Sequence, residues 1–404
     1  MANIPNRSLI LYLLAAMNFT HIVDFMIMMP LGNYLMELFS ISAQQFTVIV
    51  SSYAFSAGVS GFLSAFLIDR FDRKKALLFT YIGFTVGTLS VSFANSYEQL
   101  VLARILTGIF GGVISALVLS IVSDLYPFRE RGKAMGIVSA AFAAASVLGV
   151  PLGLFLASKL FWHAPFIMIG SLAGILAITA IFVFPNMTDH MKKQEDRLSF
   201  GLNIKHVLRS VLTDKNQLMA LGVSLFIILG QFMIIPFIAP FMQRNVGFSE
   251  DTITLLYMFG GGAVVFTGPL IGRLTDRIGP LKVFVTFLFL SAIPVVILTN
   301  LGPTPLYLAL IVSTSMFILV NGRMIPMQTM TTAVVPPETR ASYMSIKSSI
   351  QQISAALASL ISGSIVYVGA DGLFHNFPIV GYLAIGIGLI SLLIAPRLRV
   401  AAGN

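Results

Sequence analysis

The chain has 404 residues, of which 57% are hydrophobic and 10% charged, and its formal net charge is +9. Soluble proteins carry about 25% charged residues, so this composition excludes an ordinary soluble domain and indicates a chain that faces lipid. The sequence contains no cysteine, which excludes disulfides, thiolate metal sites and cysteine nucleophiles. Its five histidines lack the spacing of a metal-binding pair, so we expect no metal site.

Apolar stretches long enough to cross a membrane follow one another along the chain. A membrane helix needs about 20 mainly apolar residues. The first stretch has only Arg7 ahead of it and is too long for the hydrophobic region of a signal peptide, so it predicts a retained span. The sequence predicts twelve spans, at about 8–35, 46–68, 75–95, 98–124, 132–157, 162–185, 217–242, 252–272, 281–300, 305–333, 341–368 and 376–396.

A long polar interval, 186–216, divides these spans into two sets of six. It is rich in Lys, Arg, Asp and Gln, and its apolar pattern from Leu198 to Leu212 predicts a short amphipathic helix on the membrane surface. We therefore expect an all-α membrane protein with an N-terminal six-helix bundle at 1–185, a cytoplasmic linker at 186–216 and a C-terminal six-helix bundle at 217–404.

The basic residues are unevenly distributed between the two sides of the predicted membrane. Of the 25 Lys and Arg, 20 lie at the termini and on the loops that share their side, two lie on the opposite side, and three lie within spans. Cytoplasmic loops carry the excess of Lys and Arg, so we expect both termini to be cytoplasmic. Topology then explains the net charge, and nucleic acid is not an expected partner.

Two loop motifs recur in the second half of the chain at nearly the same offset. The segment Ala65–Lys75 follows the second span, and a similar segment, Gly272–Lys282, follows the eighth span 207 residues later. Pro127–Arg131 follows the fourth span and is echoed 209 residues later by Pro336–Arg340. Internal duplication about an axis along the membrane normal is the architecture of major facilitator transporters.

At these residues the sequence resembles the major facilitator superfamily over essentially its whole length. The loop segments resemble the family signature G-x-L-x-D-R-x-G-R-K, although the first copy has Ala65 and Asp72 where the family usually has glycine. The resemblance implies two pseudo-symmetric six-helix bundles that rock around a central site. It also implies a monomer in a bacterial inner (cytoplasmic) membrane.

Two further motifs resemble those of one branch of this family. Arg104-x-x-Thr107-Gly108 resembles the R-x-x-x-G motif of proton-coupled members. Gly149-Val-Pro151-Leu-Gly153 resembles the antiporter motif G-P-x-x-G, in a form found in arabinose- and sugar-efflux permeases of the drug:proton antiporter group. The glycines permit close helix packing, and Pro151 permits a bend.

Charged residues within the predicted spans are the candidates for a functional site, because each costs about 2.5–3.5 kcal/mol at the centre of a membrane helix. Asp24 is the one acidic residue placed deep in a span, and His21 lies on the same helix face. A desolvated carboxylate next to a cation can exchange a proton, which makes Asp24 with Arg104 the candidate coupling pair. A permanent structural pair is the alternative.

Other polar residues within spans are weaker candidates for substrate contact, since amides also hold helices together. Lys347 lies near the end of its span, so we expect it to extend to the cytoplasm. The predicted substrate-binding set is His21, Asp24, Arg104, Gln231, Asn321, Arg323, Gln351 and Gln352.

The repeated loop motifs carry acidic as well as basic residues, which the topology alone does not explain. The resemblance implies that the aspartates pair with arginines across the two halves and close the cytoplasmic side. This predicted gate comprises Asp69, Arg70, Arg73, Arg131, Asp276, Arg277 and Arg340.

The resemblance favours proton-coupled export of a drug-like or sugar-like small molecule, with no cofactor other than the coupling proton. Alternatives are a proton symporter importing a sugar or carboxylate, a lipid-type flippase, and a sensor on a transporter scaffold. The longest soluble interval, 186–216, is short for a signalling domain. An enzyme is not expected, because the sequence lacks H-E-x-x-H and G-x-S-x-G motifs.

Overall fold

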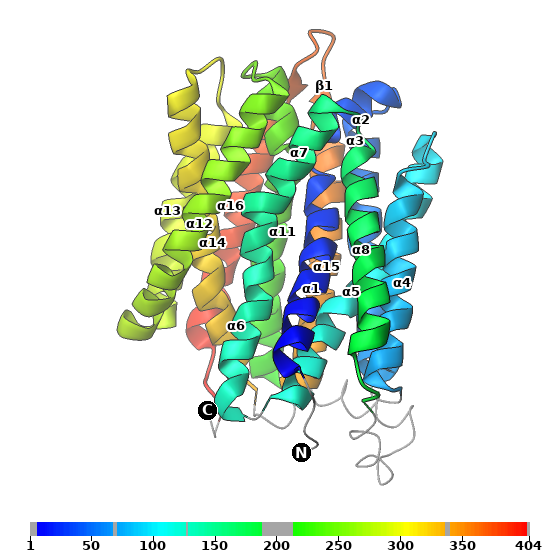
Figure 1. Cartoon of the computed structure of the whole chain (residues 1–404). Coiled ribbons are helices and arrows are strands. Elements are labelled where there is room, and N and C mark those ends of the chain that lie inside the picture. The colour runs from blue at the N-terminus through cyan, green and yellow to red at the C-terminus, as the bar shows by residue number, and fades with distance from the viewer. Residues whose placement is uncertain (1–5, 68–70, 127, 188–212, 336–339, 402–404) are drawn as a thin grey trace. The chain divides into compact units, whose positions relative to one another are not determined.

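The computed structural model describes residues 6–67, 71–126, 128–187, 213–335 and 340–401, and these are almost entirely helical (Figure 1). They divide into two compact units. The first contains residues up to Ile27 and Ser52–His206, and the second contains Met28–Ser51 and Val207–Asn404. The predicted amphipathic helix at 198–212 lies outside the described residues.

The first unit holds seven helical elements and most of an eighth. They are α1 (Arg7–Ile27), the part of α3 (Ala43–Leu67) from Ser52 onward, α4 (Arg73–Val91), α5 (Tyr97–Leu125), α6 (Phe128–Ala144), the π-helical turn η2 (Ala145–Gly149), α7 (Val150–Lys159) and α8 (Ala164–Val183). Its hydrophobic core is built by side chains of α1, α4, α5, α6 and α8.

The second unit holds the remaining elements. They are α2 (Gly32–Leu38), the start of α3, α11 (Lys215–Arg244), α12 (Glu250–Ile278), α13 (Pro280–Thr299), α14 (Leu306–Ala333), α15 (Arg340–Ile365), strands β1 (Tyr367–Val368) and β2 (Phe374–His375), α16 (Phe377–Ile394) and η3 (Ala395–Arg397). One of its cores joins α11, α13, α14 and η3. The domain boundaries expected from sequence stay a prediction.

Among the described residues, ten helices are long and apolar enough to cross a membrane. They coincide with ten of the twelve predicted spans. The other two predictions, 75–95 and 341–368, correspond to α4 and α15, and α15 is rich in serine and glutamine. Several aromatic side chains are largely exposed on the helices, including Phe79 at 71%, Phe182 at 83% and Phe266 at 77%. Apolar surface of this extent is what a lipid-facing protein presents.

Local sequence determines where several helices begin. The Asp72 carboxylate accepts hydrogen bonds from the Lys74 and Lys75 amides at 2.8 and 3.2 Å, so it caps α4. It also accepts the Met187 amide at 3.1 Å. The departure from glycine at this position therefore supplies a helix cap.

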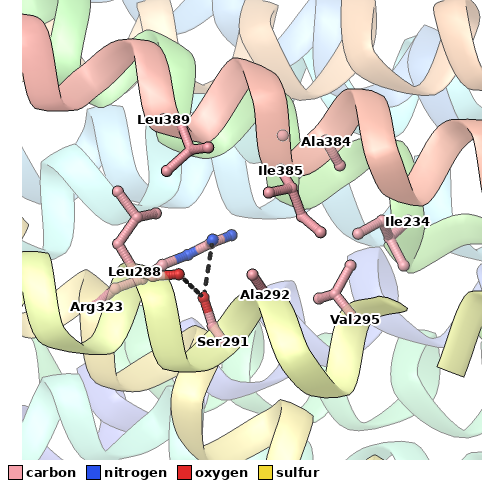
Figure 2. Close-up of a pocket in the computed structure, with 10 residues that line it drawn as sticks. Ile234, Leu288, Ser291, Ala292, Val295, Arg323, Ala384, Ile385 and Leu389 are labelled. Carbon is pink, nitrogen blue, oxygen red and sulfur yellow. Dashed lines mark hydrogen bonds between the residues drawn. The ribbon is translucent and has the colours of Figure 1, made fainter. Parts of the chain in front are cut away.

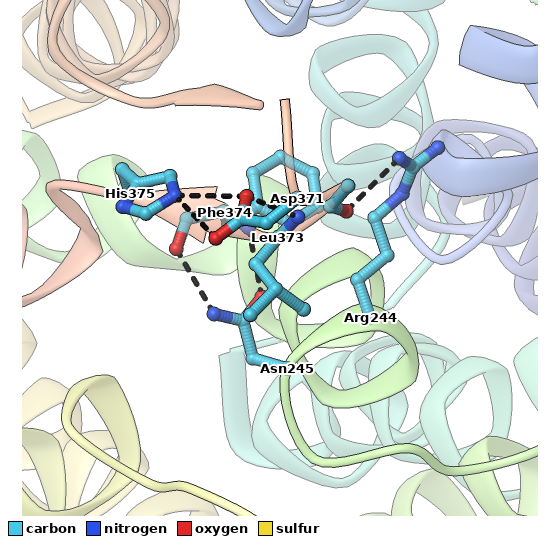
Figure 3. Close-up of polar contacts among 7 residues, drawn as sticks. Arg244, Asn245, Asp371, Leu373, Phe374 and His375 are labelled. Carbon is cyan, nitrogen blue, oxygen red and sulfur yellow. Dashed lines mark hydrogen bonds and ion pairs between the residues drawn. The ribbon is translucent and has the colours of Figure 1, made fainter. Parts of the chain in front are cut away.

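A short hairpin precedes α16 and is tied to the end of α11 (Figure 3). Asn245 exchanges two 2.9 Å hydrogen bonds with the backbone of Phe374. Arg244 donates to the Gly372 carbonyl at 3.3 Å and to the Glu37 carboxylate of α2 at 3.0 Å, and it also donates to Asn33. One guanidinium thus connects α2, α11 and the hairpin within the second unit.

Candidate functional site

The strongest candidate site lies inside the first unit, where α1 and α5 bring opposite charges together. Arg104 Nη1 donates to Asp24 Oδ2 at 2.8 Å. Both residues are completely buried, at 0% exposure. Sequence reasoning named these two residues as a pair, and the structure places them in contact.

Aromatic side chains enclose this ion pair. The Arg104 guanidinium lies over the Tyr53 ring at 4.4 Å from its centroid, a cation–π contact that desolvation strengthens. His21 lies next to Tyr53 and Phe84, with ring centroids 6.4 and 5.8 Å away. Sequence reasoning predicted His21 but missed Tyr53. A tyrosine in an apolar span is a weak signal, and its position depends on packing between α1, α3 and α5.

Glycines on α5 allow Tyr53 and α3 to approach closely. A Cβ at Gly108 would overlap the Ser56 hydroxyl and the Tyr53 backbone carbonyl, and one at Gly111 would overlap the Tyr53 hydroxyl. The predicted packing glycines of η2 and α7 have similar surroundings, since a Cβ at Gly149 would overlap Val23 of α1 and one at Gly153 would overlap Ile27 of α1. The small residues of the two motifs therefore bring α3 and α7 against their neighbours.

Around the pair, buried polar atoms remain without hydrogen-bond partners. Most buried polar groups in proteins are hydrogen-bonded, and exceptions call for a functional explanation or an additional bound group. Within the described part of the chain, the unpartnered atoms here are both ring nitrogens of His21, Asp24 Oδ1, the Tyr53 hydroxyl, the Thr88 hydroxyl and Arg104 Nε. Such a cluster has unused capacity to bind protons, water or a polar substrate group.

Pro151, predicted to permit a bend, lies at the second position of α7, the helix that directly follows the π-helical turn η2. A proline ring clashes with the carbonyl four residues earlier in a regular α-helix, and π-turns frequently occur at functional sites. The proposed flexing of this segment stays a prediction.

The predicted substrate residues of the second unit have separate surroundings. Arg323 is 6% exposed and donates to the Ser291 hydroxyl at 3.3 Å in a small cavity (Figure 2). Asn321 donates to the Phe317 carbonyl of its own helix at 2.9 Å. Gln231 and Gln351 each have one buried amide atom without a hydrogen-bond partner among the residues that the structure describes, and Gln352 is half-buried. Their role in substrate binding stays a prediction.

Lys347 does not extend to solvent as expected from its sequence position. It is 1% exposed, and its Nζ donates to the Gln328 side chain and, at 2.6 Å, to the Thr331 hydroxyl of α14. Polar partners on the neighbouring helix replace water, which a count of residues to the helix end does not reveal.

The predicted gate is only partly visible. Asp69 and Arg70 lie outside the described residues, as do the side chains of Arg131 and Arg340. Arg73 is buried, and its Nε donates to Asp124 of α5 at 3.3 Å. Asp276 and Arg277 are exposed in the last turn of α12. The gate stays a prediction.

Comparison with known proteins identifies the class. The family model of the Major Facilitator Superfamily matches residues 10–233 and 220–402. The chain belongs to this family. It is therefore a multi-pass membrane transporter of a small-molecule substrate and not an enzyme, as the sequence motifs indicate.

Relatives include transporters of Bacillus subtilis and Escherichia coli. The chain is 24% identical to the B. subtilis MFS-type transporter YcnB over 92% of its length and 89% of that protein. It is 26% identical to B. subtilis Multidrug resistance protein 3, and 27% identical to the E. coli transporter AraJ, over 58% of this chain in each case. These two matches span 48% and 57% of the relatives' own lengths, so about half of each relative is covered.

Solved structures confirm the fold. The chain superposes on an inward-facing bacterial homologue of the human lysosomal transporter Spinster with a TM-score of 0.78, at 16% identity, over 99% of both chains. The nucleoside transporter NupG superposes with a TM-score of 0.76, at 13% identity, over 96% of this chain and 99% of that one. The major facilitator fold predicted from sequence is therefore confirmed, whereas the count of twelve spans is not.

Proposed function

We propose that this protein exports a drug-like or sugar-like small molecule in exchange for protons, by alternating access. It would do so as a monomer in a bacterial inner membrane, with twelve spans and cytoplasmic termini. The observation that carries the proposal is the completely buried Asp24–Arg104 pair, in which Asp24 Oδ1 and several neighbouring polar atoms have no hydrogen-bond partner among the described residues.

Protonation of Asp24 changes the energy of this buried ion pair more than it would change that of an exposed pair. A neutral Asp24 leaves the Arg104 guanidinium buried without a counter-charge, and breaking a buried pair costs about 3–5 kcal/mol. The surroundings of Arg104 must then change through entry of water or movement of a helix, and the substrate binds after Asp24 has released its proton, so that the two alternate. A group whose protonation favours a different conformation couples a proton gradient to movement.

Export rather than import is supported by the resemblance of the Arg104–Gly108 and Gly149–Gly153 motifs to those of proton-coupled antiporters. Relatives that bear the name multidrug resistance protein agree with this direction. The gate residues named from sequence would close the cytoplasmic side when the substrate site opens outward.

Transport in everted membrane vesicles with an imposed pH gradient tests direction and coupling together. A panel of fluorescent drugs and labelled sugars first identifies a transported compound. Export predicts that the interior-acid gradient drives this compound into everted vesicles, whereas a symporter requires the opposite movement.

The matched variants are Asp24→Asn and Asp251→Asn, which remove one carboxylate each. Asp251 is exposed in the first turn of α12. We expect gradient-driven accumulation to be lost in the first variant and retained in the second, with both proteins inserted in the membrane. Undiminished accumulation by Asp24→Asn would rule out the coupling role.

A further inference from the structure

Among the described residues, those that line a small cavity inside the second unit supply a positive charge and no negative one (Figure 2). Its volume is about 10 Å³, room for one water-sized particle. Helices α11, α13, α14 and α16 line it, and Arg323 is its one charged lining residue. Apart from Ser291, the other lining side chains are apolar or absent, as at Gly230.

The guanidinium of Arg323 is poorly compensated. Its Nη1 hydrogen bond to Ser291 Oγ is long, at 3.3 Å, and its Nε has no hydrogen-bond partner in the part of the chain that the structure describes. Among the described residues, no carboxylate forms an ion pair with it, in contrast to Arg104, which contacts Asp24 at 2.8 Å. Arginine remains protonated in proteins, so it cannot escape the cost of burial by losing its charge.

The Ser291 hydroxyl cannot fully compensate the buried charge of Arg323. Its hydroxyl proton is used in a 2.9 Å hydrogen bond to the Leu288 carbonyl, so towards Arg323 the oxygen only accepts. A neutral hydroxyl offsets a full buried charge incompletely, and buried charges are normally paired with an opposite charge.

We propose that this cavity binds one small inorganic anion of the halide class, held by Arg323. The cavity is too small for a sugar or a drug. Arg323 lies ten residues before the end of α14 at Ala333, about 15 Å along the helix at 1.5 Å per residue. A phospholipid headgroup at the membrane surface therefore does not reach it. The site does not involve Asp24 and is independent of the proposed proton coupling.

Thermal unfolding of the purified full-length protein in detergent tests the site without any transport assay. The midpoint temperature of unfolding is measured in sodium bromide, sodium chloride and sodium gluconate at the same ionic strength. A ligand that binds only the folded state raises the midpoint, so we expect a saturable rise of roughly 2–4 °C with either halide over gluconate.

The variant Arg323→Gln should lose this halide-dependent rise. Arg273→Gln is the matched control, because it removes one positive charge at an exposed position of α12 and should keep the rise. Equal midpoints in halide and gluconate for the unmodified protein would overturn the proposal. So would an undiminished halide effect in Arg323→Gln.

A second measurement applies even if Arg323→Gln does not fold. Crystals of the unmodified protein grown in bromide should show anomalous scattering between the Arg323 guanidinium, Ser291 and Ala292, the side chains that face this space in Figure 2. Density without anomalous signal at that position would identify a water molecule and contradict the anion site.

Discussion

At the scale of single residues, the proposed function depends most on Asp24, whose charge is costly to bury within a membrane. Asp24 stands out in the sequence because it lies in the middle of an apolar span. The cost of burying a charge in a membrane helix therefore identifies Asp24 from sequence, and it identifies Arg104 in the same way. Sequence reasoning could not find Tyr53 or Thr88, since neither carries a charge and their position depends on how α3 and α4 pack against α1.

Replacing Arg104 by Gln should destabilise the protein by about 3–5 kcal/mol, because it leaves Asp24 buried without its partner. The double variant Asp24→Asn/Arg104→Gln should recover most of that loss, since no buried charge remains at the pair. Unfolding titrations of the two single variants and the double variant measure this coupling. Simple additivity would show that the pair is not energetically linked.

Replacing Gly108 by Ala should destabilise the first unit by about 1–3 kcal/mol, because the new Cβ overlaps the backbone of Tyr53 and forces α3 and α5 apart. Gly136→Ala is the matched control. Gly136 is also helical, and a Cβ there has no atom within 4 Å. We expect that variant to keep or slightly gain stability in the same unfolding measurement.

At the scale of helices and loops, the sequence predicts which helices exist and where they lie better than it predicts breaks and irregular turns. The predicted spans 98–124, 281–300 and 305–333 agree within a few residues with α5, α13 and α14. The first prediction was too long, because the chain turns after Ile27 and α2 begins at Gly32. An apolar run does not show such a break.

The π-turn η2 and the β1–β2 hairpin were not predicted. The hairpin strands have two residues each, too few for alternation of apolar and polar side chains to be recognised. Arg244 and Asn245 hold the hairpin through tertiary hydrogen bonds, and both residues lie more than 120 positions earlier in the chain than the hairpin residues that they contact.

Replacing Arg244 by Gln should loosen the hairpin at 367–376, because it removes the charge that connects the Gly372 carbonyl with α2. Hydrogen exchange of this segment should become faster. Glu37→Gln should change exchange little, because the Glu37 side chain is 70% exposed and exposed ion pairs contribute little. Equal effects of the two variants would assign the stabilisation to the ion pair instead.

The hairpin should also depend on pH through Asp371. The hydrogen bond from His375 lowers the pKa of the Asp371 carboxyl below its usual value, aided by the Leu373 amide. A lowered folded-state pKa contributes stability above the unfolded-state value of about 3.9. That contribution is lost as the pH falls through the folded-state pKa. The protection of the 367–376 amides, measured as exchange relative to the intrinsic rate at each pH, should therefore fall below about pH 4, and Asp371→Asn should abolish this loss of protection.

At the scale of the whole molecule, the repeated loop motifs and the uneven distribution of Lys and Arg predicted the fold. Two motifs repeated at offsets of 207 and 209 residues indicated duplicated halves, and the family model confirms the superfamily across the chain. Substrate identity could not be predicted. It depends on the shape and polarity of a site formed by many uncharged side chains, and single residues such as Gln231 or Asn321 do not define it.

In the proposed mechanism substrate and proton alternate at Asp24, and proton release on substrate binding tests this alternation most directly. Purified substrate-free protein in weak buffer, at a pH at which Asp24 is protonated, is mixed with the compound identified by the vesicle screen. We expect release of about one proton per bound substrate from the unmodified protein, and none from Asp24→Asn. Equal proton release from Asp24→Asn would contradict it.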